Sequence, residues 1–159
     1  MLSVVIRSLV TRMSVRMVDI GAKSDVVRVA RAEGLIKLSP STVKLVVEGR
    51  VEKGDVFTVS KIAAISAVKK TPDILPLCHN VPITYVDVRF EVVGEDRIKV
   101  ETVVKAVAKT GVEMEALVGT SVALLTIWDM VKKYEKDESG QYPHTRIEYV
   151  RVVEKVKEG

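Results

Sequence analysis

The sequence is poor in several kinds of residue, and each shortage excludes a class of protein. Cys78 is the only cysteine among the 159 residues, so no disulfide can form within one chain and a reducing, cytoplasmic compartment is expected. Aromatic residues make up 4%, so the core must be built from valine, isoleucine, leucine and alanine. No uninterrupted apolar run approaches the roughly 20 residues of a membrane-spanning helix, and we expect no membrane association.

Acidic residues are also absent from the first 18 positions, which hold three of the arginines. These three arginines account for most of the net charge of +4, and the rest of the chain is close to balanced. Such a balance does not favour a general nucleic-acid binder. The opening stretch lacks the long serine-rich region of a transit peptide, so we predict that residues 1–16 form a poorly ordered extension before a single domain, residues 17–159. Translation from Met13 or Met17 is an alternative.

Capping signals and helical spacing predict three helices. The Ser39-Pro40 pair suits the N-cap and first position of a short helix over residues 40–48. Asp55 is expected to cap a second helix, which Thr71-Pro72 ends. A long third helix is predicted over residues 112 to about 134.

Alternating apolar and polar residues predict the strands. Residues 83–93 and 98–108 alternate on either side of a turn that contains Gly94, which predicts a hairpin. A short strand is expected at residues 35–38 and a closing strand at residues 146–156. With the first helix as an insertion, the order β-α-β-β-α-β predicts an α+β fold of the ferredoxin-like split βαβ type. In that fold an antiparallel sheet carries its helices on one face.

The predicted long helix is apolar almost all round between Ala116 and Trp128. Such a helix needs packing partners on more than one side, and the sheet of its own domain covers one side only. We therefore expect another subunit to cover the second side, which would make the protein an oligomer. Cover by the N-terminal segment is the alternative.

Two loops hold candidate binding residues. Lys53 precedes a glycine at a helix start, where free N–H groups can hold a phosphate, although a solvated lysine beside the capping Asp55 is the more ordinary interpretation. In the loop 75–80, the apolar neighbours of Cys78 favour a buried, inert thiol. His79 either donates to a phosphate or satisfies a backbone carbonyl. One cysteine and two histidines cannot supply three or four soft zinc ligands, so no metal site is expected.

Charged residues lie at both ends of the long helix. Glu113 and Glu115 at its start suit the helix dipole, which is the ordinary structural explanation. Asp129 and Lys132 share a helix face near its end, where partial burial is expected to shift their pKa values toward acid–base use. At about 1.5 Å per residue, Glu115 and Asp129 are roughly 21 Å apart. Either one pair is structural or two subunits bring opposite helix ends together, and we favour the second interpretation.

These clusters, in this order, resemble the MoaC family. The resemblance runs from Met17 to about Asp137, and its most specific part is the block Gly111–Leu117 followed by Asp129-Met130. The other matching stretches are Met17-Val18-Asp19-Ile20, Ala22-Lys23, Lys53-Gly54-Asp55-Val56-Phe57, Leu75-Pro76-Leu77-Cys78-His79, Lys109-Thr110 and Thr126-Ile127-Trp128.

The resemblance implies a lyase of molybdenum cofactor biosynthesis. Members convert 3′,8-cyclo-7,8-dihydroguanosine 5′-triphosphate into cyclic pyranopterin monophosphate and release pyrophosphate. The family also implies a homohexamer, a trimer of dimers, with the active site at a dimer interface. It implies no cofactor or metal held by the protein itself, while Mg²⁺ on the triphosphate stays open. By matching position, the catalytic residues would be Lys53, Asp129 and Lys132. The substrate would contact Leu77, Cys78, His79, Glu113, Met114, Glu115, Arg28 and Lys155.

The chain departs from the family pattern at three places. Asn80 stands where many members have a proline after the Cys-His pair. The Gly- and Lys-rich tail is missing, which makes the match of Lys155 the weakest of the set. The segment from Asp137 to Thr145 is longer than the corresponding family turn.

The main alternative is a ferredoxin-like module that binds RNA or a small effector. RNA-binding modules stack bases on aromatic residues of one sheet face, whereas the spacing of Tyr85 and Phe90 places them on opposite faces. An effector-binding module would leave the clusters around Lys53, Glu113 and Asp129 without a purpose.

Overall fold

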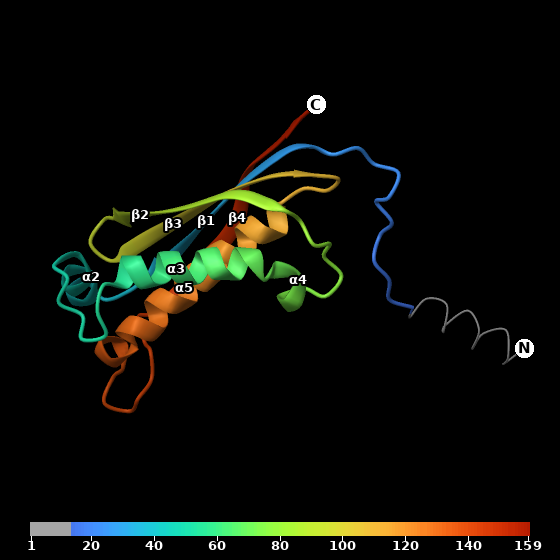
Figure 1. Ribbon diagram of the computed structural model, residues 1–159. Helices are drawn as coiled ribbons and strands as arrows, with labels where there is room; N and C mark the ends of the chain where they lie inside the picture. The colour runs from blue at the N-terminus through green and yellow to red at the C-terminus, as the bar shows by residue number, and fades with distance from the viewer. Residues whose placement is uncertain (1–13) are drawn as a thin grey trace, which may run out of the picture.

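The computed structural model describes residues 14–159, so most of the predicted N-terminal extension lies outside it. Residues 14–25 run without helix or strand to the first strand (Figure 1). In chain order the elements are β1 (Val26–Lys37), α2 (Pro40–Val47), α3 (Val56–Lys69), α4 (Thr71–Ile74), β2 (Ile83–Val93), β3 (Arg97–Ala108), α5 (Glu113–Glu135) and β4 (Arg146–Glu158).

The four strands form one antiparallel sheet in the order β2-β3-β1-β4. Figure 1 shows α3 and α5 side by side on one face of this sheet, with α2 at one end. The order of elements and strands is that of the split βαβ arrangement, so the predicted α+β fold is confirmed.

The first strand, β1, has 12 residues and is three times as long as the strand predicted at residues 35–38. It lies in the interior of the sheet, between β3 and β4. Its inward-facing positions include Ala30, Ala32 and Gly34, whose small side chains give a weak hydrophobic pattern. The helix α5 leaves no room for a side chain at Gly34, since a Cβ there would lie 2.6 Å from Leu124 Cδ1. The predicted start of this strand at residue 35 was therefore wrong. Residues 26–34 include small inward-facing residues that pack closely, and these do not give the alternation of large apolar residues that marks a strand.

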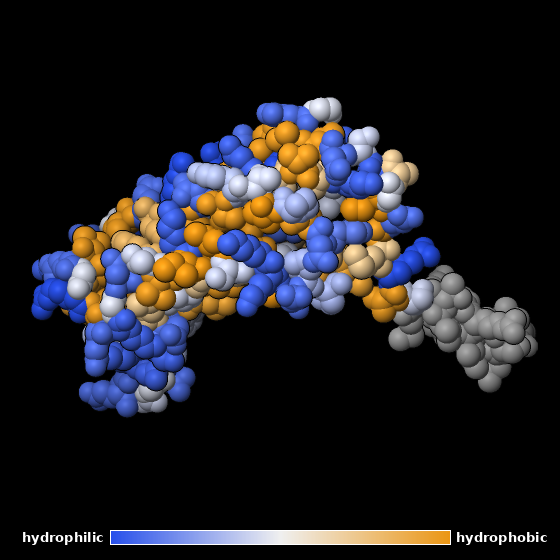
Figure 2. All heavy atoms as spheres, viewed as in Figure 1, coloured by the Kyte–Doolittle hydropathy of each residue, from blue (hydrophilic) through white to orange (hydrophobic). Residues whose placement is uncertain are grey.

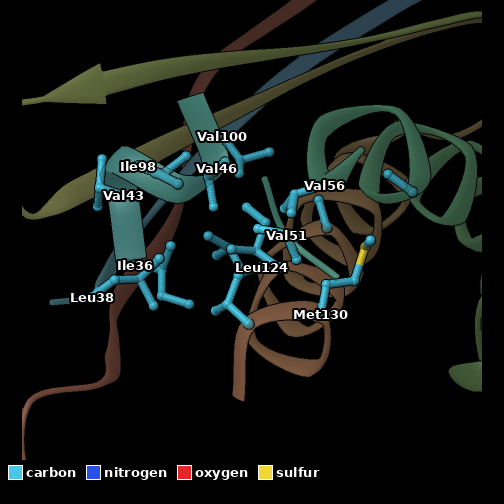
Figure 3. Close-up of a cluster of buried hydrophobic side chains, with 14 of the residues drawn as sticks. Ile36, Leu38, Val43, Val46, Val51, Val56, Ile98, Val100, Leu124 and Met130 are labelled. Atoms are coloured by element: carbon cyan, nitrogen blue, oxygen red, sulfur yellow. The ribbon is translucent and has the colours of Figure 1, made fainter. Parts of the chain in front are cut away.

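The core lies between the sheet and the helices. Figure 3 shows aliphatic side chains from β1, β3, α2 and α5 pointing toward one another, with Val56 at the start of α3 beside them. A second cluster of buried alanines and valines continues the core toward the N-terminal end of α5. The alternation predicted for β3 is confirmed, because its inward-facing residues from Ile98 to Ala108 are all buried.

The second side of α5 is covered by α3 of the same chain, and neither a second subunit nor the N-terminal segment is needed there. Gly119 permits this close approach, since a Cβ at this position would lie 2.7 Å from Val68 Cγ2 of α3 and 3.1 Å from Thr102 Cγ2 of β3. The expectation that a partner covers this side was wrong for most of the helix. Leu125 on α5 and Ile62 on α3 remain 58% and 61% exposed.

The helix α5 is also long and apolar enough, by length and composition alone, to cross a membrane. Its apolar run is interrupted by polar residues such as Thr120 and Thr126, so the expectation that no stretch is long and apolar enough to span a membrane was wrong for this helix. More than half of its apolar stretch is buried inside the fold, which is typical of the core helix of a soluble protein.

The predicted caps differ in their outcome. The Asp55 side chain accepts a hydrogen bond from the Thr58 N–H at 2.7 Å and caps α3 as predicted. Ser39 occupies the N-cap of α2, but its side chain makes no capping hydrogen bond. Its N–H instead donates to the carboxylate of Glu135, a buried residue at the end of α5 that also accepts from the Thr145 hydroxyl. A contact between distant segments therefore replaces the local cap.

Candidate active site

Six of the residues matched as substrate contacts line one pocket of about 360 Å³ beside the N-terminal end of α5. Three of them come from the loop after α4 and three from the first turn of α5. Residues of the N-terminal segment and of the link between β3 and α5 complete the wall. The predicted residues in this pocket are Leu77, Cys78, His79, Glu113, Met114 and Glu115.

The N-terminal segment is held against this pocket by two hydrogen bonds. His79 Nε2 lies 2.7 Å from the carbonyl oxygen of Val18 and donates its proton to it, since a carbonyl can only accept. Lys109 Nζ donates to the carbonyl oxygen of Gly21 at 2.9 Å. Two roles were open for His79, a donor to a phosphate or a donor to a backbone carbonyl. The structure shows the second, with the Val18 carbonyl as the acceptor.

The two glutamates of the pocket differ in environment. Glu115 is 4% exposed, and burial, with the nearby charge of Glu113, raises the pKa of its carboxyl. Burial acts in the same direction on Glu113, but its ion pair with Lys155 and a hydrogen bond from its own N–H lower its pKa overall. The pocket thus holds one ionised carboxylate beside one carboxyl that keeps its proton more readily.

Cys78 is partly buried, and burial together with the charge of Glu115 raises the pKa of its thiol. A thiol with a raised pKa is a poor nucleophile at neutral pH, in agreement with the inert thiol that its apolar neighbours predicted.

Arg28 and Lys155 lie beside this pocket. Lys155 on β4 pairs with Glu113, and Arg28 on β1 contributes to lowering the pKa of Glu113. Arg28 also donates to two carbonyl oxygens at the end of β3, those of Ala108 at 3.3 Å and Lys109 at 3.2 Å. The structure therefore brings all eight predicted contact residues to one end of the sheet.

The three residues matched as catalytic form a separate cluster. Lys53 Nζ lies 2.8 Å from Asp129 Oδ2, and Lys132 Nζ lies 2.9 Å from Asp129 Oδ1. Lys53 also donates to the main-chain carbonyl of Asp129 at 2.9 Å. The loop between α2 and α3 therefore presents Lys53 to the last turns of α5, and Lys53 is not merely a solvated lysine beside a cap.

The pKa values of Asp129 and Lys132 are not set by burial, contrary to what the sequence had led us to expect. The hydrogen bonds from Lys53 and Lys132 lower the pKa of Asp129 to about 2, and the same contact raises the pKa of Lys132. The side chains of Asp129 and Lys132 are 56% and 45% exposed, so the ion pairs and not burial set these shifts. The expectation of burial-driven shifts was wrong for a single chain, in which Asp129 is a carboxylate and Lys132 a cation.

The two clusters lie at opposite ends of α5, which runs unbroken from Glu113 to Glu135 (Figure 1). A helix rises about 1.5 Å per residue, so Glu115 and Asp129 are roughly 21 Å apart along its axis. A small substrate in the pocket of one chain does not reach the lysine cluster of the same chain.

Other pocket residues were not predicted as contacts. Lys23 is among them, and it lies in a stretch that the sequence already matched to the family, as do Val18, Ile20, Thr110 and Gly111. Val81 lies outside the matched stretches and follows the Cys-His loop. Across residues 14–159, no three His, Cys, Asp or Glu side chains converge as a set of metal ligands.

The fold and these clusters define a class: a ferredoxin-like protein with a carboxylate-bearing pocket at one end of its long helix and a Lys-Asp-Lys cluster at the other. The family model described as "MoaC family" matches residues 17–158. This protein belongs to the MoaC family.

The chain is similar to several proteins named "Probable cyclic pyranopterin monophosphate synthase". The protein from Pyrococcus furiosus is 62% identical over 144 residues, which cover 91% of this chain and 92% of the relative. The protein from Methanosarcina acetivorans is 56% identical over 142 residues, with 89% of each chain covered. The protein from Saccharolobus solfataricus is 55% identical over 143 residues, covering 90% of this chain and 95% of the relative.

Proposed function

We propose that this protein is a cyclic pyranopterin monophosphate synthase, a lyase of molybdenum cofactor biosynthesis. It converts 3′,8-cyclo-7,8-dihydroguanosine 5′-triphosphate into cyclic pyranopterin monophosphate and releases pyrophosphate. The observation that carries this proposal is the family match over residues 17–158, together with relatives of that name at about 60% identity over nine-tenths of the chain.

The pocket beside α5 binds the base of the GTP-derived substrate. Its apolar wall, which includes Leu77 and Met114, offers contact to a planar ring, and the Glu113 carboxylate accepts hydrogen bonds from ring N–H and amino groups. Lys155 and Arg28 beside Glu113 supply positive charge for the phosphates. Cys78, His79 and Glu115 complete the contact surface.

The Lys53–Asp129–Lys132 cluster carries out the chemistry. The reaction requires acids and bases for ring opening and reclosure, and cations that stabilise the departing phosphates. Asp129 raises the pKa of Lys132, so Lys132 enters the reaction as a cation that can stabilise negative charge on the phosphates. Asp129 holds both ammonium groups within 3 Å of its carboxylate and so fixes their positions.

A complete active site combines the pocket of one subunit with the lysine cluster of another. The separation of roughly 21 Å along α5 supports this arrangement, because no single chain brings the two clusters together. The apolar residues Ile62 and Leu125 remain exposed on the helical layer, and Figure 2 shows hydrophobic residues on the face where α3 lies in front. The assembly is a homohexamer built as a trimer of dimers, with the site at a dimer interface.

The protein itself contributes no metal ligands to this reaction, and Mg²⁺, where required, arrives on the triphosphate. The enzyme works in the cytoplasm, where the single thiol of Cys78 stays reduced.

The test is turnover of the cyclised guanosine triphosphate by purified protein, followed by pyrophosphate release and by pterin fluorescence. We expect both signals from the wild type and neither from Lys53→Ala. Absence of both signals from a folded wild-type oligomer, with and without Mg²⁺, would refute the assignment.

A further inference from the structure

The loop between α2 and α3 is fixed on both sides of Lys53. Val51 is 5% exposed and belongs to the hydrophobic core. The Gly54 N–H donates to the Val51 carbonyl oxygen at 3.0 Å, and the positive φ of Gly54, 115°, suits a tight turn at this point. Asp55 then caps α3. The turn that carries Lys53 must also be held against α5, because Asp129, the partner of Lys53, lies on that helix.

Tyr134, in the last turn of α5, makes a hydrogen bond that holds this turn. The N–H of Glu52, the residue before Lys53, donates to the Tyr134 hydroxyl oxygen at 2.9 Å. The Tyr134 ring is partly buried and packs against the hydrophobic core, so the hydroxyl is carried by an anchored side chain. The bond therefore acts on the main chain of the loop and not on one of its flexible side chains.

A second link joins the same two segments. The carboxylate of Glu52 pairs with the ammonium group of Lys133 on α5. The Glu52 and Lys133 side chains are 68% and 63% exposed, so water and salt screen the pair and it contributes little. The hydrogen bond to Tyr134 is directional and reaches a main-chain atom. It is therefore the contact that determines where the backbone before Lys53 lies on α5.

The loop thus contacts α5 at two places, Tyr134 and Asp129. These residues are five positions apart, which is about 7.5 Å along the helix axis. Two contacts at this spacing fix both the position and the direction of the chain between them. Lys53 depends on them, because a lysine side chain has many rotamers and the Lys53 and Asp129 side chains are 47% and 56% exposed.

We propose that Tyr134 is a positioning residue: its hydroxyl holds the α2–α3 loop on α5 and thereby keeps the ammonium group of Lys53 at Asp129. The proposal rests on the function proposed above, in which Lys53 takes part in the chemistry. In this role Tyr134 acts through the loop and not on the substrate. It is not one of the residues matched to the family motifs, and only the structure brings it to Lys53.

The first measurement compares three variants in turnover of the cyclised triphosphate. Tyr134→Phe removes only the hydroxyl. We expect its kcat to fall about tenfold with KM within about twofold, since a misplacement of about 1 Å can cost about 100-fold. Glu52→Gln loses the ion pair with Lys133 but keeps the N–H that donates to Tyr134, so its kcat should stay within about twofold of the wild type. Tyr149→Phe loses a hydroxyl bond to Glu33 on another part of the sheet and should also keep its kcat.

The controls decide what a fall in kcat means, once thermal unfolding shows that all three variants are folded. Wild-type kcat in Tyr134→Phe would overturn the proposal. An equal fall in Tyr149→Phe would also overturn it, because the loss of any hydroxyl bond would then have the same effect. An equal fall in Glu52→Gln would contradict it by showing that the ion pair holds the loop.

The second measurement does not depend on activity. The hydrogen bond from Lys53 is the largest cause of the lowered pKa of Asp129, about 2 against the ordinary 3.8. When Lys53 is held less firmly, the pKa of Asp129 should rise toward 3.8 in Tyr134→Phe and stay unchanged in Tyr149→Phe. A ¹³C titration of the carboxyl groups measures this, with Asp129→Asn identifying the signal. A raised pKa in Tyr134→Phe without turnover in the wild type refutes the proposed function alone, and an unchanged pKa refutes the role of Tyr134.

Discussion

Lys53 and Asp129 are joined by two hydrogen bonds from one ammonium group, although 76 residues separate them in the sequence. Lys53 Nζ reaches both the carboxylate of Asp129, at 2.8 Å, and its main-chain carbonyl oxygen, at 2.9 Å. The carbonyl belongs to the helix backbone, so this contact fixes the α2–α3 loop to α5 as well as pairing two charges. Lys53 and Asp129 therefore belong to the same half of any site that two subunits share.

Mixtures of inactive variants test whether the lysine cluster and the pocket of one active site come from different subunits. In a dimer with two shared sites, Lys53→Ala chains mixed with Glu113→Ala chains should regain activity, because one site of each mixed dimer receives both intact halves. For equal amounts and random exchange, about a quarter of the sites should be active. The measurement is pyrophosphate release after the variants are unfolded and refolded together.

The matched control is a mixture of Lys53→Ala with Asp129→Ala chains. Both changes damage the same half of the site, so this mixture should stay inactive. Activity in the control, or none in the first mixture, would contradict the proposed arrangement.

The Asp129 carboxylate should remain ionised throughout the working pH range. The hydrogen bonds from Lys53 and Lys132 hold its pKa at about 2, so the pairing stabilises the fold above the ordinary pKa of 3.8 and is lost as pH falls through about 2. This contribution to stability is small because the pair is exposed to solvent. A ¹³C carboxylate titration should show no Asp129 transition above pH 4.

Asp129→Asn should abolish most of the turnover, by about 10²–10⁴-fold, since neither lysine keeps a charged anchor. The variant should also lower the pKa of Lys132, because Asp129 is the main cause of its increase. Near-normal kcat in a folded Asn variant would exclude Asp129 from the chemistry.

Glu115→Gln should stabilise the protein at alkaline pH. Burial and the Glu113 charge raise the pKa of the Glu115 carboxyl above its ordinary 4.5, so the folded state binds a proton that the unfolded state releases. Stability therefore falls as pH rises from 4.5 through the raised pKa, and the neutral amide avoids this loss. Thermal unfolding should give a higher Tm for the variant at pH 8 and little difference at pH 4. Exposed Glu138→Gln is the control, and an equal gain at both pH values would contradict the explanation.

Gly34→Ala should destabilise the fold by about 1–3 kcal/mol through overpacking. The new Cβ would lie 2.6 Å from Leu124 Cδ1 and 2.9 Å from the Tyr149 carbonyl oxygen, between α5 and β4. Gly21→Ala is the control, because its Cβ would meet only the Asp19 carboxylate, at 3.1 Å. Denaturant unfolding measures both, and equal stability of the two variants would show that β1 and α5 can separate without cost.

The sequence by itself determined the hairpin, the long helix and the fold class, because one-sided burial leaves a local period of two or 3.6 residues. It also contained every residue of the two clusters, in motifs that resemble one family. The tertiary structure alone decided the length of β1, whose inward residues are small because α5 lies against them. Only the tertiary structure shows that the Ser39 N–H donates to Glu135 and that the Lys53 ammonium group donates to Asp129. Each of these contacts joins segments far apart in the chain, and no local pattern encodes them.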